Sequence, residues 1–94
     1  MSIKKRIIEK ALREKGFCVE ETHHRYFHHT VDGKKSGVST YMSHGSDDDI
    51  GDNLINMMKR QLRLQTTKQA RDLFQCPMSG EEYIELLRKQ GVIR

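Results

Sequence analysis

Histidine is the residue type in this sequence that is most able to do chemistry. All five histidines lie between positions 23 and 44: His23, His24, His28, His29 and His44. A neutral imidazole accepts and returns a proton near pH 6.5, and it is also a common metal ligand. The cluster therefore raises three alternatives, which are a metal site, ordinary polar surface and acid–base chemistry.

The spacing of the histidines argues against a metal site. Zinc requires three or four ligands around one ion. On a strand, His24 and His28 would share a face but lie ~13 Å apart, and the neighbours His28 and His29 would point to opposite faces. The sequence has no Cys-x-x-Cys or His-Glu-x-x-His motif. We expect no metal and no other cofactor, and we expect His28 and His29 to be exposed polar residues of a small sheet.

The elements that must position the histidines follow from the hydropathy pattern. Apolar residues at helical spacing predict a helix over 3–15. Alternating and β-branched stretches predict strands over about 17–21, 24–31 and 35–43. Asp32-Gly33, between the last two strands, is a strong hairpin signal. The three strands would form an antiparallel sheet, which needs helices packed against it to bury one face.

The second half of the chain is predicted to be helical. A loop over 43–49 precedes a helix over about 51–63. Two capping boxes, Thr66-Thr67-Lys68-Gln69 and Ser79-Gly80-Glu81-Glu82, begin two further helices. The predicted class is α+β, in which the first five elements match the α-β-β-β-α topology of double-stranded-RNA-binding domains. Two C-terminal helices complete a single domain over 1–94.

This arrangement predicts where acid–base chemistry would occur. In a tight hairpin at Asp32-Gly33 the numbers of paired residues sum to about 65, so His44 is expected roughly opposite residue 21 and near His23. RNA cleavage needs one imidazole to take the proton of the 2′-OH and another to protonate the leaving 5′-oxygen. His24 is the alternative to His23. The candidate catalytic residues are therefore His23, His44 and His24.

Residues 3–64 resemble the HicA family of small toxin ribonucleases, the mRNA-cleaving halves of HicA–HicB toxin–antitoxin pairs. The resemblance begins with a basic amphipathic helix. The segments that follow it, in order, are Lys15-Gly16-Phe17, Thr22-His23-His24, Val31-Asp32-Gly33-Lys34-Lys35, His44-Gly45, and a helix that begins Gly51-Asp52-Asn53-Leu54 and ends Lys59-Arg60-Gln61-Leu62.

The resemblance implies a fold like that of double-stranded-RNA-binding domains, metal-independent cleavage of mRNA and inhibition by a cognate HicB-like antitoxin protein. The family's Gly-Ser-His motif places its catalytic histidine at His23. This sequence has Glu21-Thr22 where the family has Gly-Ser, so a carboxylate replaces a flexible glycine. The helical extension over 65–94 is a second departure, and it would complete the core, cover the sheet or form a partner surface.

Basic residues are the expected contacts to the RNA backbone. Arg25 is the best candidate, because it neighbours His23 in sequence and is expected to share its face, where it would stabilise charge on the phosphorane. Tyr26, Phe27 and Tyr41 are candidates for base stacking, with at least one of them expected in the core. The other candidate RNA contacts are Lys4, Lys5, Arg6, Lys34, Lys35, Lys59, Arg60 and Arg63.

Composition limits the remaining possibilities. The chain has 94 residues and a formal charge of +4, which suits one small domain and permits an acidic partner such as RNA. It lacks the apolar stretch of a membrane span or a signal peptide, so a cytoplasmic location is expected, with Cys18 and Cys76 as free thiols.

Two alternatives to a ribonuclease remain: a non-catalytic RNA-binding or protein-interaction module on the same fold, and a small regulatory protein. The oligomeric state is left open.

Overall fold

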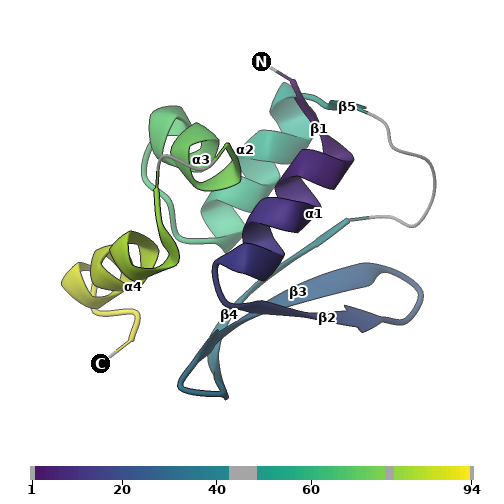
Figure 1. Cartoon of the computed structure of the whole chain (residues 1–94). Coiled ribbons are helices and arrows are strands. Elements are labelled where there is room, and N and C mark those ends of the chain that lie inside the picture. Colours follow the sequence, from purple (N-terminus) through teal and green to yellow (C-terminus); the bar gives the residue numbers. More distant parts are fainter. Residues whose placement is uncertain (1, 43–48, 76–77, 94) are drawn as a thin grey trace.

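The chain forms a small α+β fold. The computed structural model describes residues 2–42, 49–75 and 78–93. In these ranges it contains a three-stranded antiparallel sheet, a two-stranded sheet and four helices (Figure 1). The elements are β1 (Ile3–Lys4), α1 (Lys5–Glu14), β2 (Phe17–Glu21), β3 (Arg25–Val31), β4 (Lys34–Met42), β5 (Asp49–Ile50), α2 (Asp52–Gln61), α3 (Thr67–Phe74) and α4 (Gly80–Lys89).

The first helix begins later than its apolar pattern predicts. Ile3 and Lys4 are extended and pair with Ile50 and Asp49, which forms the β1–β5 ribbon and delays α1 to Lys5. Gly16 follows the helix with a φ of 92°, as expected for a residue that leaves a helix in the left-handed region. Its carbonyl accepts a hydrogen bond from the Thr30 backbone N–H at 2.9 Å, so the helix end is tied directly to the sheet.

The β3–β4 hairpin confirms the turn predicted from Asp32-Gly33. Both turn residues have positive φ, 52° and 79°, and Val31 pairs with Lys34 across a two-residue loop. Positive φ at both positions defines a type I′ turn, which matches the twist of the flanking strands and favours Asp-Gly. The local sequence is therefore sufficient to determine this end of the sheet.

The strand register changes partway along the hairpin. The numbers of paired residues, expected to sum to about 65 with a one-residue slip left open, sum to 65 at Thr30↔Lys35 and to 67 at His28↔Ser39. The register therefore shifts by two residues within the hairpin. The shift faces Gly37, whose φ of 92° is accessible mainly to glycine. Because the shift is two residues, the alternation of faces is preserved.

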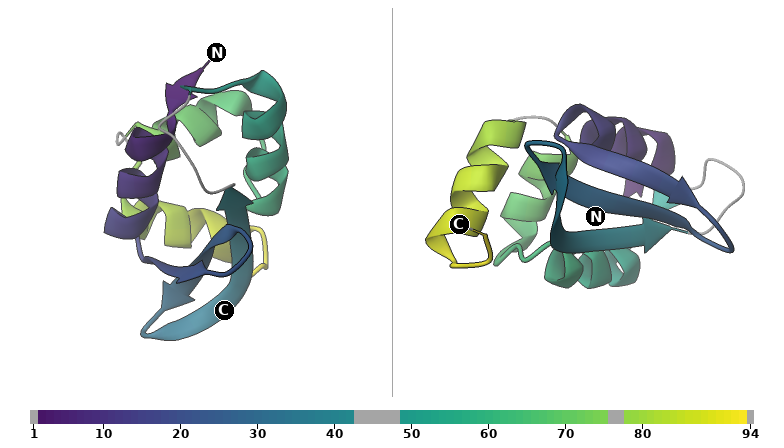
Figure 2. Two further views of the ribbon diagram at one scale, coloured as in Figure 1. Left: turned by 90° about the vertical axis from the view of Figure 1, so that its right-hand side faces the viewer. Right: turned by 90° about the horizontal axis from the view of Figure 1, so that it is seen from below.

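The helices cover one face of the three-stranded sheet. Viewed from below, the sheet lies in front of the helices, so its other face is not covered by any described helix (Figure 2). Phe27, Val38 and Met42 point toward the helices and are buried in the common core. Burial of one face and solvation of the other explains the alternating pattern of the strands.

The C-terminal helices complete the core. The capping box predicted for α4 is confirmed, because Ser79 and Glu82 form both of its hydrogen bonds. At α3 only half of the predicted box forms: the Thr66 side chain accepts from the Gln69 N–H, but the Gln69 side chain accepts from the Gln65 N–H. The buried residues of α3 and α4 are Ala70, Leu73, Phe74, Tyr83 and Leu87, each of which is 0% exposed. Of the three roles considered for residues 65–94, core completion is therefore the one that these contacts demonstrate.

Tyr83 joins α4 to the rest of the molecule. Its hydroxyl donates to the Leu62 carbonyl at 2.7 Å, and its ring packs against Phe17 and His29 at centroid distances of 5.8 and 5.0 Å. Burial raises the pKa of Tyr83, so the phenol stays protonated as the donor of this bond. Within the described ranges, none of the helices combines the length and apolarity that crossing a bilayer requires.

Candidate functional site

The turn between β2 and β3 brings two histidines together. Residues 22–24 connect the strands, and the Thr22 N–H donates to the His24 carbonyl at 3.0 Å, which closes the turn. The rings of His23 and His24 have centroids 4.8 Å apart and an interplanar angle of 53°. His23 is exposed and His24 is half-buried. Two imidazoles thus lie side by side at a position that solvent can reach.

Tyrosine rings hold this histidine pair against the sheet. His23 Nε2 lies 3.4 Å from the Tyr26 hydroxyl, and the His24 ring packs against Tyr41 at a centroid distance of 5.1 Å. Tyr26 and Tyr41 face each other across β3 and β4 at 5.6 Å. The pair therefore lies at one end of a continuous ring surface on the sheet face that the helices leave uncovered.

The two imidazoles have different surroundings. His24 Nδ1 is buried and has no hydrogen-bond partner among the described residues, so Nε2 is the ring nitrogen of His24 that a substrate could meet. His23 is more exposed; its Nε2 lies 3.4 Å from the Tyr26 hydroxyl, and its ring packs against those of His24 and Tyr26. Two adjacent imidazoles can act as an acid–base pair once a substrate is bound. The structure makes His24 the immediate neighbour of His23, whereas His44 lies outside the described residues.

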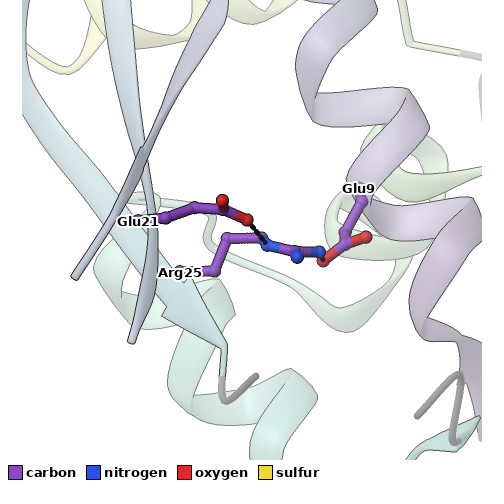
Figure 3. Close-up of polar contacts among 3 residues, drawn as sticks. All are labelled: Glu9, Glu21 and Arg25. Atoms are coloured by element: carbon purple, nitrogen blue, oxygen red, sulfur yellow. Dashed lines mark hydrogen bonds and ion pairs between the residues drawn. The ribbon is translucent and has the colours of Figure 1, made fainter. Parts of the chain in front are cut away.

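Arg25 is held by two carboxylates. Its Nη1 donates to Glu9 Oε2 of α1 at 2.7 Å, and its Nε donates to Glu21 Oε1 of β2 at 2.7 Å (Figure 3). These bonds, that to Glu9 above all, raise the pKa of Arg25. The expectation that Arg25 shares a face with His23 is wrong, because Arg25 points toward α1 while His23 contacts Tyr26 on the other side of β3. Its charge is therefore engaged within the fold.

The Glu9–Arg25–Glu21 cluster fastens both ends of the histidine turn to α1. Glu21 is the last residue of β2 and Arg25 is the first of β3. Arg25 is consequently a positioning residue for the turn, and Glu21, which replaces the glycine of the resembling motif, supplies one of its partners. The departure of this sequence from that motif thus has a structural role.

Replacing Arg25 with methionine should loosen the turn. We expect a loss of about 1 kcal/mol of unfolding free energy, the upper end for partly exposed ion pairs. We also expect faster hydrogen exchange at the Thr22 amide, which closes the turn. Arg88→Met is the matched control, because it breaks one exposed ion pair with Glu85 on α4 and should leave that amide unchanged. Equal exchange in Arg25→Met and the wild type would show that the ion cluster does not position the turn.

Three of the predicted basic contacts, Lys5, Lys34 and Lys35, do not form a patch with the histidines. Lys5 is only 6% exposed, and this burial does not fit a phosphate contact. Lys34 and Lys35 are exposed at the opposite end of β3, a seven-residue strand that spans about 20 Å at ~3.3 Å per residue. On α2, Lys59 is half-buried and Arg60 is exposed.

His28 and His29 differ in burial, and neither is fully exposed as expected, because His28 is half-buried and His29 is buried. His28 lies on the uncovered face, with Nε2 3.3 Å from Glu20 Oε1. His29 is 0% exposed, so its prediction as a surface residue is wrong. Because side chains alternate along β3, the His29 side chain points to the sheet face that the helices cover, where the Tyr83 ring of α4 packs against it. Its Nδ1 lies 2.9 Å from Ser36 Oγ, and its Nε2 has no partner among the described residues.

Burial lowers the pKa of His29, which makes folding sensitive to acid. The unfolded chain then binds more protons than the folded one below the ordinary histidine pKa of 6.5. We expect unfolding free energy to fall as pH drops from 6.5 toward the lower folded pKa, by at most about 1.4 kcal/mol per pH unit from this group. Urea titrations at several pH values test this expectation. His29→Phe should be less acid-sensitive than the wild type, and an equal pH dependence in both proteins would contradict it.

No three His, Cys, Asp or Glu side chains in the described ranges are grouped so that they could hold a metal ion. The candidate site is thus the pair His23 and His24, with Tyr26 and Tyr41 beside it and the Arg25 cluster beneath it. Sequence reasoning identified the two histidines, the two tyrosines and Arg25, but it placed Arg25 on the wrong side of β3 and did not identify its partner Glu9. In comparisons with known proteins, the chain matches no family model, no curated protein and no solved structure.

Proposed function

We propose that the protein is a HicA-like ribonuclease that cleaves mRNA by metal-independent histidine acid–base chemistry. The observation that supports this most is the accessible imidazole pair, His23 and His24, whose rings are 4.8 Å apart at the end of the uncovered sheet face. The fold proposed with it is the double-stranded-RNA-binding-like α-β-β-β-α arrangement, extended by α3 and α4. A cognate HicB-like antitoxin is its proposed partner in the cytoplasm.

In the proposed reaction, one imidazole takes the proton of a ribose 2′-OH, and the 2′-oxygen forms a bond to the adjacent phosphorus. The bond from phosphorus to the 5′-oxygen breaks, and the second imidazole gives its proton to that leaving oxygen. The products are a 2′,3′-cyclic phosphate and a free 5′-OH. General acid and base catalysis of this kind contributes about 10²–10⁴-fold. The tyrosine rings beside the pair would hold the neighbouring bases.

The experiment is incubation of the purified protein with single-stranded RNA in EDTA. Cleavage that produces 2′,3′-cyclic phosphate ends, and that stops when the 2′-OH at the cleaved position is replaced by hydrogen, is the expected result. Cleavage that EDTA abolishes, or that proceeds without a 2′-OH, would overturn the proposed chemistry. In cells, induced expression should arrest growth, and growth should recover when a neighbouring antitoxin gene is co-expressed.

One observation favours a second candidate, a non-catalytic RNA-binding module on the same fold. Arg25 is the cation nearest the histidine pair in sequence, and Glu9 and Glu21 both engage it. A guanidinium that is already paired offers less stabilisation to a phosphorane than a free one. Salt-sensitive RNA binding without any cleavage in the same assay would favour this second candidate.

A further inference from the structure

The uncovered sheet face is a surface of hydrogen-bonding rings. On this face β3 presents Tyr26 and His28, which are stacked at 6.1 Å with an interplanar angle of 18°. Tyr41 of β4 packs against Tyr26, and Ser39 pairs with His28. The face ends at the histidine turn, and no described helix crosses it (Figure 2). At its β4 edge, the Tyr41 hydroxyl donates to Met57 Sδ of α2 at 4.0 Å. We call Tyr26, His28, Ser39 and Tyr41 the ring face.

The chemistry of the ring face suits nucleic acid bases. Bases stack on aromatic and histidine rings with little dependence on sequence. Tyrosine and arginine are also enriched at protein interfaces, so the choice of RNA rests on the arginine pair beside the face and on the proposed function. Tyr26, His28 and Tyr41 each have a polar group, and they are half-buried rather than fully solvated. Such rings are held in place by their neighbours before any ligand arrives.

An arginine pair lies at the β4 edge of the ring face. Arg60 and Arg63 line a surface hollow together with Gly37, Ser39 and Gln61. Both arginines are exposed, and neither forms an ion pair with any residue in the described ranges. A guanidinium binds phosphate through parallel N–H donors. Ser39 belongs to both the hollow and the ring face, so the two surfaces are continuous.

The opposite edge of the sheet has the opposite charge. Glu20 of β2 is exposed and lies 3.3 Å from His28. A polyanion on the ring face would therefore avoid the β2 edge and approach the β4 edge, where Arg60 and Arg63 lie. This asymmetry determines which side of the sheet its phosphates occupy.

We infer that single-stranded RNA binds across the ring face, with bases stacked on Tyr26 and Tyr41 and a phosphate held in the hollow by Arg60 and Arg63. The inference rests on the proposed function for its ligand, RNA, but not on cleavage. It adds the β4 edge as a phosphate subsite that is separate from the histidine turn. It also commits to single strands, because bases in a duplex have no free faces for stacking on these rings.

Binding is tested with a fluorescent single-stranded oligonucleotide whose riboses are all 2′-O-methylated, so that no 2′-OH is available for cleavage. Fluorescence anisotropy should show that Tyr41→Leu weakens binding about 5- to 100-fold, whereas Tyr41→Phe, which keeps the ring, binds like the wild type. Arg60→Gln combined with Arg63→Gln should weaken binding and reduce the salt slope by about 0.7 for each lost phosphate contact. Glu20→Gln should strengthen binding.

Lys10→Gln combined with Arg13→Gln is the matched control for charge, because both residues are exposed cations on α1. Circular dichroism and thermal melts show whether each variant is folded. The inference is overturned if the Arg60 and Arg63 substitutions weaken binding no more than this control, if Tyr41→Leu binds like the wild type, or if duplex RNA binds more tightly than the single strand. Binding of the methylated strand without cleavage of unmodified RNA would refute the proposed ribonuclease activity but would still support the ring face as an RNA-binding surface.

Discussion

Alanine at His23 or at His24 is expected to slow RNA cleavage by about 10²- to 10⁴-fold, because each change removes a general acid or base. The double variant should be inactive within detection. Its effect should be smaller than the product of the two single effects, because the two groups act in one step. Single-turnover cleavage of an unmodified oligonucleotide in EDTA measures these rates.

Arg13→Ala is the control for this prediction. Arg13 is exposed on α1 and lies outside both the histidine turn and the ring face. Its loss should leave the cleavage rate constant within a few-fold of the wild-type value. A His23→Ala, His24→Ala double variant that cleaves like the wild type would refute the assignment of the site, and it would indicate a contaminating nuclease or a different catalytic group.

Replacing Tyr83 with alanine is expected to cost about 3–5 kcal/mol of unfolding free energy, the range for removing a large buried ring. Tyr83 is 0% exposed and contacts Phe17 and His29, and its hydroxyl bonds to the Leu62 carbonyl. Tyr83→Phe should cost about 1–2 kcal/mol, because it removes only that hydrogen bond and leaves the carbonyl without its donor. Urea denaturation followed by circular dichroism measures both values.

Glu85→Ala provides the control on the same helix. Glu85 is exposed, and its loss breaks only an exposed pair with Arg88, so a change within about 0.5 kcal/mol is expected. A Tyr83→Ala protein as stable as the wild type would mean that α4 is peripheral to the core. A cost in the expected range would show that residues of the C-terminal helices are required for the fold.

Local signals in the sequence were sufficient for most of the elements. Asp32-Gly33 predicts its own turn, because few other residues adopt positive φ at both central positions. Ser79 and Glu82 predict the start of α4, because the capping box involves only neighbouring backbone groups. Each of these features is determined by residues that are within four positions of one another, so it can be predicted from the sequence without knowledge of the tertiary structure.

The errors arise where distant segments meet. His29 is buried because Tyr83, far along the chain, covers it, and no pattern around His29 contains that information. Arg25 is paired because α1 places Glu9 beside β3. The register shift opposite Gly37 and the pairing of Ile3 with Ile50 likewise depend on tertiary contacts. The residues of the candidate site were therefore predictable, but their electrostatic partners were not.

The most direct test of the account is to map where RNA touches the protein. NMR spectra of the labelled protein are recorded while the 2′-O-methylated single strand is added, and the ring signals of His23, His24 and Tyr41 are followed. The account predicts that these signals shift together with the Arg60 and Arg63 guanidinium signals, while the buried His29 ring stays unchanged. Shifts confined to the Lys34-Lys35 turn or to α4, with the histidine turn unaffected, would contradict it.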